Sequence, residues 1–222
     1  MSIRIIHLRK LLLLFYAPEN LRTSNVRDGI RAQIRKEAGE ESEGGDFYTP
    51  FWADAKQHMF GVADLATSTA IRVAANTRRK RLYEQSQRGF LSWWNDKRRW
   101  RNEPIQPVDL PTKARLPIPS VGGTVKIENV FGLNSGPGFH RLIYPYFSEK
   151  PPIGDEAARL GLWAMSQGLG RHHELSDMRI LDVQRGASFG TIDGALRGDE
   201  ADIFERRYAH VISEWDRLRK EY

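Results

Sequence analysis

The chain has 222 residues, 40% of them hydrophobic, which is enough for one large globular domain or two small ones. It contains no cysteine, which excludes disulfides, thiolate metal ligands and thiol nucleophiles. Its formal net charge is +6, and the position of that charge along the chain decides which partners it suggests.

The first residues are apolar but fall short of the length of a membrane span. Residues 11–17 form an apolar run, whereas a spanning helix needs about 20 such residues. No small-x-small cleavage site follows, because Pro18-Glu19-Asn20 comes next. We therefore expect residues 1–17 to form a buried helix, with no membrane contact and a cytoplasmic location, which the absence of cysteine also fits.

Three further helices are expected before the charged part of the chain. Residues 20–38 carry apolar side chains at helical spacing, Val26, Ile30 and Ile34. Residues 40–46 are acidic and contain glycine, which predicts a loop. Pro50 suits the start of a helix that runs to about residue 60. Residues 64–76 are rich in alanine and predict another helix.

Residues 78–101 hold the positive charge of the chain. Their basic side chains are Arg78, Arg79, Lys80, Arg81, Arg88, Lys97, Arg98, Arg99 and Arg101. These nine bases and two acids, Glu84 and Asp96, give the segment a charge of +7, which leaves −1 for the rest of the chain. The basicity is therefore local, and these nine side chains are the candidate nucleic-acid-binding residues.

Read as a helix, the basic segment is amphipathic. At about 100° per residue, its apolar side chains share one arc, namely Leu82, Tyr83, Phe90, Trp93, Trp94 and Trp100. Arg81, Arg88 and Arg99 lie on the opposite side, so one face can pack on a core while the other is cationic. Gly89 is a weak position, costing about 1 kcal/mol relative to alanine, and could mark a bend.

This amphipathic pattern has three interpretations. The cationic stripe could neutralise nucleic-acid phosphates with release of counterions, and any tryptophan that faces outward could stack on the bases of a single strand. Alternatively, the aromatic residues are core and the arginines form an ordinary solvated face. A third possibility is that the stripe docks on an acidic partner protein.

The chain changes character after the basic segment. Residues 103–120 contain five of the eleven prolines, a spacing that forbids a helix or a central strand and predicts an extended connector or an edge that wraps the fold. Thirteen of the nineteen glycines follow residue 121. We therefore divide the chain into a helical region at 1–102, a Pro-rich connector at 103–120 and an α/β region at 121–222, together forming one compact unit.

The second half mixes strands and helices. It predicts strands at 124–131, 139–147 and 178–183 and helices at 155–169 and 199–222. The first two strands form a hairpin joined by the glycine-rich turn 132–138, and Pro145 places the end of the second at an edge. The predicted fold class is α+β, with a helical N-terminal half and a small mixed sheet, hairpin plus further strand, flanked by helices in the C-terminal half.

Familiar catalytic and metal motifs are missing from the sequence. The 132–138 segment lacks the Lys-Ser/Thr that a phosphate-binding loop needs. His172 and His173 are adjacent without a third ligand at metal spacing, and the other histidines, His7, His58, His140 and His210, show no such spacing. There is no Gly-x-Ser-x-Gly and no local Ser/His/Asp arrangement. We expect no metal site and no cofactor.

Asp182 is the polar residue of greatest interest. It ends a short apolar strand, and sites in α/β layers often lie at strand ends. Alternatively, it pairs with Arg185 or caps a turn. Glu128, on the first hairpin strand, could line up with Asp182 across a sheet. A basic surface could also extend over Arg141, Tyr144 and Arg159.

The order helix, strand, strand, helix, strand, helix over residues 78–222 resembles the core of the PD-(D/E)XK nuclease superfamily. The resemblance is topological and covers about two-thirds of the chain. That family holds Mg²⁺ with an Asp at one strand end and Glu-x-Lys on the next strand. Here the second hairpin strand reads Leu142-Ile-Tyr-Pro-Tyr146, with no acid and no lysine, and Asp182-Val-Gln184 falls after the helix. The resemblance thus implies a catalytically silent scaffold.

The sequence predicts a non-catalytic nucleic-acid-binding subunit, with DNA or RNA and a partner protein as its partners. The resemblance adds the setting, a microbial nucleic-acid-processing or defence assembly. One alternative is a metal-dependent nuclease with an unorthodox site at Glu128, Asp182 and Gln184, which would require Mg²⁺. Another is a protein-binding accessory or structural subunit whose cationic stripe faces an acidic partner.

Overall fold

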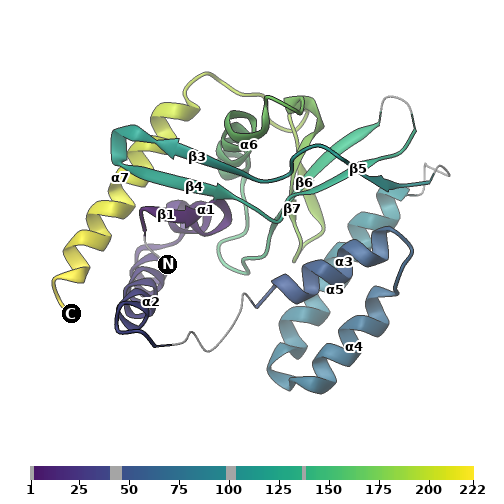
Figure 1. The fold of residues 1–222 in the computed structure, drawn as a ribbon, viewed down its shortest axis with the longest axis horizontal. Helices are drawn as coiled ribbons and strands as arrows, with labels where there is room; N and C mark the ends of the chain where they lie inside the picture. Colours follow the sequence, from purple (N-terminus) through teal and green to yellow (C-terminus); the bar gives the residue numbers. More distant parts are fainter. Residues whose placement is uncertain (1–2, 41–46, 99–103, 137–138) are drawn as a thin grey trace.

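A computed structural model describes residues 3–40, 47–98, 104–136 and 139–222, without the side chains of Lys97 and Arg98. The fold is α+β, as predicted, and the described residues form seven α-helices and two small sheets (Figure 1). Among them, no helix combines the length and apolar character needed to cross a membrane. The predicted loop at 40–46 lies almost entirely outside the described residues.

The helices follow the predicted pattern closely. They are α1 (Leu8–Tyr16), α2 (Glu19–Glu37), α3 (Thr49–Met59), α4 (Leu65–Ala75), α5 (Lys80–Arg98), α6 (Asp155–Leu169) and α7 (Glu200–Arg219). Pro50 lies in the first turn of α3, and the carboxylate of Asp64 caps α4 by accepting a hydrogen bond from the Thr67 N–H at 2.8 Å.

The strands build two separate sheets. They are β1 (Ile5–His7), β2 (Gln106–Pro107), β3 (Ala114–Ile118), β4 (Gly123–Ile127), β5 (Phe131–Asn134), β6 (His140–Tyr146), β7 (Met178–Asp182) and β8 (Ala187–Phe189). One sheet has the order β1-β4-β3 and the other β2-β5-β6-β7-β8. The Pro-rich connector supplies an edge strand to each sheet, β3 to the first and β2 to the second, which confirms its predicted edge position.

The helix predicted for residues 1–17 is wrong at its start. Residues 5–7 are extended and form β1, which pairs in parallel with β4 so that Ile6 lies opposite Val125. Ile6 is buried while Ile5 is exposed, as expected of a strand with one covered face. The partner strand is more than a hundred residues away in sequence, so no local pattern could reveal it.

The predicted hairpin is also displaced. The expected strand 124–131 is divided at Asn129, whose φ of 66° turns the chain out of one sheet and into the other. The real hairpin pairs β5 with β6, so Gly132 is a strand residue opposite Leu142 rather than part of the turn. A Cβ on Gly132 would overlap the side chain of Val108, which explains the glycine.

The sequence predicts an edge position for Pro145. The strand that contains it, β6, instead lies between β5 and β7. The pairing with β5 ends at Ile143, so β6 is bonded on one side only where the proline stands. The ring therefore interrupts no ladder on the β5 side.

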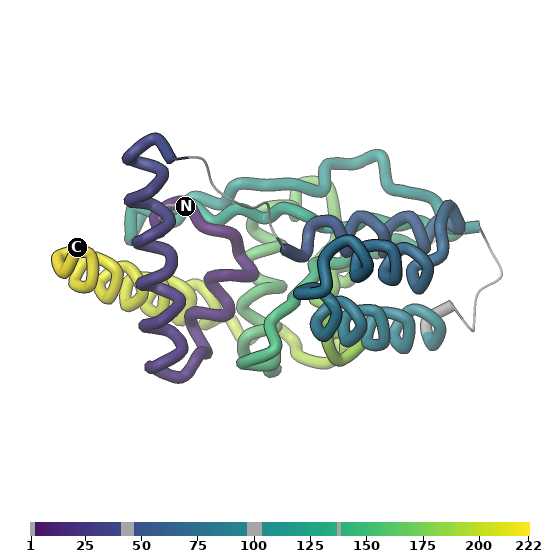
Figure 2. The backbone as a smooth tube through the Cα atoms, turned by 90° about the horizontal axis from the view of Figure 1, so that it is seen from below, coloured from purple at the N-terminus to yellow at the C-terminus, as the bar shows by residue number. Residues whose placement is uncertain are grey.

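The five-stranded sheet separates two hydrophobic clusters. Along β6, Leu142 and Tyr144 face the cluster built with α1, α2, α6 and α7, whereas Ile143 faces the cluster built with α3, α4 and α5. This alternation is the period of two expected of a strand covered on both faces. Helices α3, α4 and α5 gather at one end of the molecule, and α2 and α7 lie at the other (Figures 1 and 2).

Candidate nucleic-acid interface

Helix α5 presents the face that its sequence predicts. Tyr83 and Phe90 are fully buried and Trp93 and Trp94 nearly so, in one cluster with α3 and α4. On the opposite side of the helix, Arg88 is exposed. Part of the basic segment lies outside the described residues, namely Arg99, Trp100, Arg101 and the side chains of Lys97 and Arg98.

Helix α5 continues through Gly89 without a break. A Cβ at this position would overlap the backbone oxygen of Val183 and come within 2.8 Å of the Gln184 carbonyl carbon. From the other side, Gly186, whose φ is 67°, lies directly against the Gly89 carbonyl. The two glycines let the backbone of α5 rest on the turn that joins β7 to β8.

The cationic side chains between residues 78 and 88 differ in how far other residues of the protein neutralise their charge. The guanidinium of Arg81 donates two hydrogen bonds to the Glu149 carboxylate, one of them at 2.8 Å, and this arginine lowers the pKa of Glu149. The guanidinium of Arg79 lies 5.5 Å from the ring centroid of Tyr83. The remaining side chains, Arg78, Lys80 and Arg88, are exposed and have no ion-pair partner within the described part of the chain.

Asp182 makes the contacts that the structural interpretation predicts. Its carboxylate accepts hydrogen bonds from the Gln184 N–H at 3.1 Å and the Arg185 guanidinium at 2.9 Å, so it both caps the turn and pairs with Arg185. Burial raises its pKa, against the lowering effect of Arg185. The side chain of Gln184 donates to the Ser86 hydroxyl of α5 at 2.8 Å. These bonds fix the turn against which α5 rests.

The structure does not align Glu128 with Asp182. Glu128 follows β4 in the three-stranded sheet and pairs with Lys126 at 3.2 Å, whereas Asp182 ends β7 in the other sheet. Among residues 3–40, 47–98, 104–136 and 139–222, no group of three or more acidic or histidine side chains is placed to hold a metal ion.

The extension of the basic surface over Tyr144 and Arg159 is wrong. Tyr144 is buried, and its hydroxyl accepts a hydrogen bond from the Arg9 N–H at 2.7 Å. Arg159 is buried too, and it bonds the carboxylates of Asp199, at 2.6 Å, and Glu200. Both side chains therefore hold the core together rather than facing a partner.

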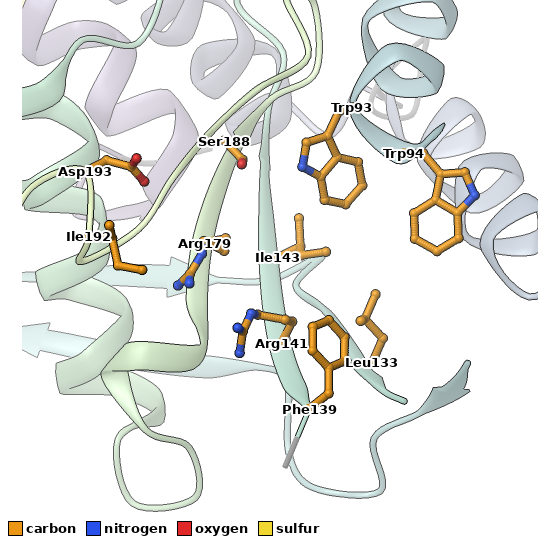
Figure 3. A pocket seen from close by; sticks show the side chains of 10 residues that line it. All are labelled: Trp93, Trp94, Leu133, Phe139, Arg141, Ile143, Arg179, Ser188, Ile192 and Asp193. Carbon is orange, nitrogen blue, oxygen red and sulfur yellow. The ribbon is translucent and has the colours of Figure 1, made fainter. Parts of the chain in front are cut away.

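A pocket of about 410 Å³ lies beside α5, over the five-stranded sheet (Figure 3). Aromatic and aliphatic side chains form one side of it, namely Trp93, Trp94, Leu133, Phe139 and Ile143. Polar side chains form the other side, namely Arg141, Arg179, Ser188 and Asp193, and Ile192 stands at the mouth, 90% exposed. The pocket thus joins a stacking surface to a charged one.

The two arginines of the pocket are held differently. Arg141 pairs with Asp177 at 2.9 Å and lies over the ring of Phe139, 4.8 Å from its centroid. Arg179 donates from Nη1 to the carbonyls of Ser176 and Met178, at 2.8 and 2.7 Å, and no carboxylate of the described residues pairs with it. Burial and the charge of Arg141 lower its pKa.

Sequence reasoning missed this pocket, although it noted Arg141. The lining residues come from α5, four strands of one sheet and the loops beside them, so no spacing along the chain brings them together. The available signal was the aromatic content of α5, which marked Trp93 and Trp94 but not the cavity that they border.

Two histidines that show no metal spacing in sequence are neighbours in space. His140 Nε2 lies 2.8 Å from His173 Nδ1, and the outer ring nitrogens contact Asn134 Oδ1 and the Pro111 carbonyl, each at 2.7 Å. Burial lowers the pKa of His140. This hydrogen-bonded chain ties the Pro-rich connector to the β5–β6 hairpin.

No known protein family, curated protein or solved structure matches this chain. The function must therefore be inferred from the side chains and their geometry.

Proposed function

We propose that the protein is a non-catalytic nucleic-acid-binding subunit that works in the cytoplasm and contacts phosphates through the exposed side of α5. The observation that carries this proposal is a set of three exposed cations, Arg78, Lys80 and Arg88, which have no ion-pair partner among the residues that the structure describes. Arg78 lies in the short 3₁₀ turn directly before α5, and Lys80 and Arg88 lie in α5, whose opposite face packs in a core, so the backbone that carries these cations is fixed before any ligand arrives.

Phosphates are the best counterpart for this surface. Each contact that a lysine or arginine makes to a phosphate releases counterions, and the resulting affinity needs no particular base sequence. The pocket at the other end of the same helix, lined in part by aromatic side chains, supports a nucleic acid over an acidic protein, because bases stack on aromatic side chains. The setting, a microbial nucleic-acid-processing or defence assembly, rests on the topological resemblance alone.

We propose binding without catalysis because the Asp182 carboxylate is occupied in holding the turn against which α5 packs. Both of its oxygens accept hydrogen bonds from the turn that follows it, from the Gln184 N–H and from Arg185. Cleavage of DNA or RNA that depends on Mg²⁺ and disappears in a folded Asp182→Asn variant would replace this proposal by the nuclease alternative.

The first test is fluorescence anisotropy with labelled single- and double-stranded DNA and RNA, at low and physiological salt. For about four to six phosphate contacts, the logarithm of the affinity should fall with the logarithm of salt concentration at a slope of roughly −3 to −5. A protein that binds none of the four nucleic acids at low salt would contradict the proposal, and an acidic partner protein would then be sought.

A matched pair of variants locates the surface. Changing Arg78, Lys80 and Arg88 to Gln should weaken binding and make the slope shallower by about 2 for a single strand, since each lost contact removes about 0.7. The control changes three exposed cations elsewhere by the same charge, and these are Arg35, Lys36 and Arg115. Equal loss of affinity in both triple variants would show that net charge, and not α5, carries the binding.

A further inference from the structure

We propose that the pocket between α5 and the five-stranded sheet holds one unpaired nucleotide, with its base against Trp93 and Phe139 and its phosphate on Arg179. This rests on the proposed function and adds to it the kind of strand that is recognised. A base inside a duplex is stacked on both faces and paired at its edge, so only a single-stranded or extruded base can enter such a pocket.

The apolar side of the pocket suits a nucleobase. Trp93 and Phe139 offer aromatic surfaces, and Leu133 and Ile143 of the sheet lie between the elements that carry them (Figure 3). Base–aromatic stacking tolerates any base, because every base has a π-face. The volume of about 410 Å³ falls within the range of roughly 300–1,000 Å³ that small-molecule sites occupy.

The cation of the pocket suits a phosphate. Arg141 is already paired with Asp177, whereas Arg179 uses only its Nη1 on backbone carbonyls. Its Nε and Nη2 groups make no hydrogen bond to any other residue that the structure describes, and this leaves a donor pair for an anion. Burial and the charge of Arg141 lower the pKa of Arg179, while Asp193 and Asp177 act in the opposite direction.

Polar groups at the rim offer hydrogen-bonding atoms beside the apolar side of the pocket. The indole Nε1–H of Trp93 is buried and has no acceptor among the described residues, and it faces the side where Ser188 lies (Figure 3). Asp193 accepts one hydrogen bond at Oδ2 from the Gly190 N–H and keeps Oδ1 for a further donor. An amino group of a base could donate a hydrogen bond to the Oδ1 atom of Asp193.

The pocket is tested by titrating the full chain with nucleoside monophosphates and following binding by calorimetry. Arg179→Gln should weaken the affinity about tenfold or more, because it removes a charge-assisted hydrogen bond to the phosphate. Arg115→Gln, an equal charge change at an exposed position on the other sheet, should leave the affinity unchanged. The matching nucleoside without phosphate should bind weakly to all three proteins.

A second variant, Ile192→Glu, tests the pocket even if Arg179→Gln fails to fold. Ile192 is 90% exposed at the mouth of the pocket, so Ile192→Glu cannot disturb the core, yet it places a negative charge beside the path of the phosphate. It should weaken nucleotide binding several-fold. The assignment would be overturned if the parent protein bound no nucleotide at millimolar concentration. It would also be overturned if a folded Arg179→Gln protein and the Ile192→Glu protein both kept the parent's affinity.

Oligonucleotides separate this inference from the proposed function. Ile192→Glu should lose the preference for single over double strands while keeping the steep salt dependence supplied by α5. The Arg78, Lys80 and Arg88 triple variant should lose affinity for oligonucleotides and still bind a mononucleotide. Mononucleotide binding without any oligonucleotide binding would leave the pocket as a site for a free nucleotide and refute the proposed function. An unchanged strand preference in Ile192→Glu would refute the pocket alone.

Discussion

At the scale of single residues, Arg81 of α5 is held in an ion pair by Glu149. The two side chains share two hydrogen bonds, although Arg81 remains exposed at the surface of α5. Exposed ion pairs of this kind contribute little to stability, because water and salt screen them. A phosphate could therefore displace Glu149, but it would have to repel or move a carboxylate in doing so.

Glu149→Gln should accordingly raise the affinity for nucleic acid. It removes the competing charge and leaves Arg81 as a further phosphate contact, so we expect a gain of several-fold at low salt and a slope steeper by about 0.7 to 0.9. The control is Glu37→Gln, which breaks a similar pair with Arg219 at the other end of the molecule. An affinity that stays the same in Glu149→Gln while the control also changes nothing would show that phosphates do not reach Arg81.

At the scale of elements, α5 is held by the contact between Gly89 and the β7–β8 turn. Gly89→Ala would normally stabilise a helix by about 1 kcal/mol. Here the added methyl group meets the backbone of Val183 and Gln184, which cannot move aside as a flexible side chain could. We expect destabilisation by about 2–3 kcal/mol in urea unfolding, the usual range for overpacking.

The comparison for this prediction is Ser92→Ala, an exposed position one turn further along the same helix. It should change stability by no more than about 0.5 kcal/mol. A Gly89→Ala protein as stable as the parent would mean that α5 stands further from the turn than the structure places it. If the Gly89→Ala protein is destabilised but still binds nucleic acid below its unfolding midpoint, the contact at Gly89 is needed for stability and not for binding by the exposed side of α5.

The elements also show what the sequence could and could not reveal. The phase of α5 was predictable, because the spacing of Tyr83, Phe90 and Trp93 lies within one helix and periodicity is a local signal. The strand β1 and the division of residues 124–131 were not, because both depend on partners distant in the chain. Likewise Arg179 could be recognised as a ligand group only after folding brought it to the same cavity as Trp93.

At the scale of the whole molecule, two half-buried histidines, His7 and His140, link stability to pH. His7 belongs to β1 and His140 to β6, so one lies in each sheet. Burial is the main cause that lowers the pKa of both, with Lys126 adding to the effect at His7. Each imidazole is therefore neutral in the folded protein at a pH where the unfolded chain, with a histidine pKa of about 6.5, already takes up a proton.

The sign of the effect follows from this difference in proton binding. Between the lowered folded pKa and about 6.5, the unfolded state binds more protons, so stability rises with pH. The contribution of the two histidines to the free energy of unfolding is fully present above about pH 6.5. It is lost as the pH falls through their pKa values in the folded protein. Asp182 acts in the opposite direction, because its raised pKa lets the folded state hold the extra proton. The parent curve alone therefore mixes two effects.

A double variant, His7→Asn with His140→Gln, isolates the histidines. Urea unfolding at pH 7.5 and 5.5 should show that the parent loses more stability on acidification than the double variant does. Because Asp182 is present in both proteins, its contribution to stability cancels when their losses on acidification are compared. The control His172→Gln changes an exposed histidine and should follow the parent. If the double variant lost as much stability as the parent on acidification, the two histidines would not be neutral in the folded protein, and the hydrogen-bonded chain through His140 and His173 would have to hold a proton.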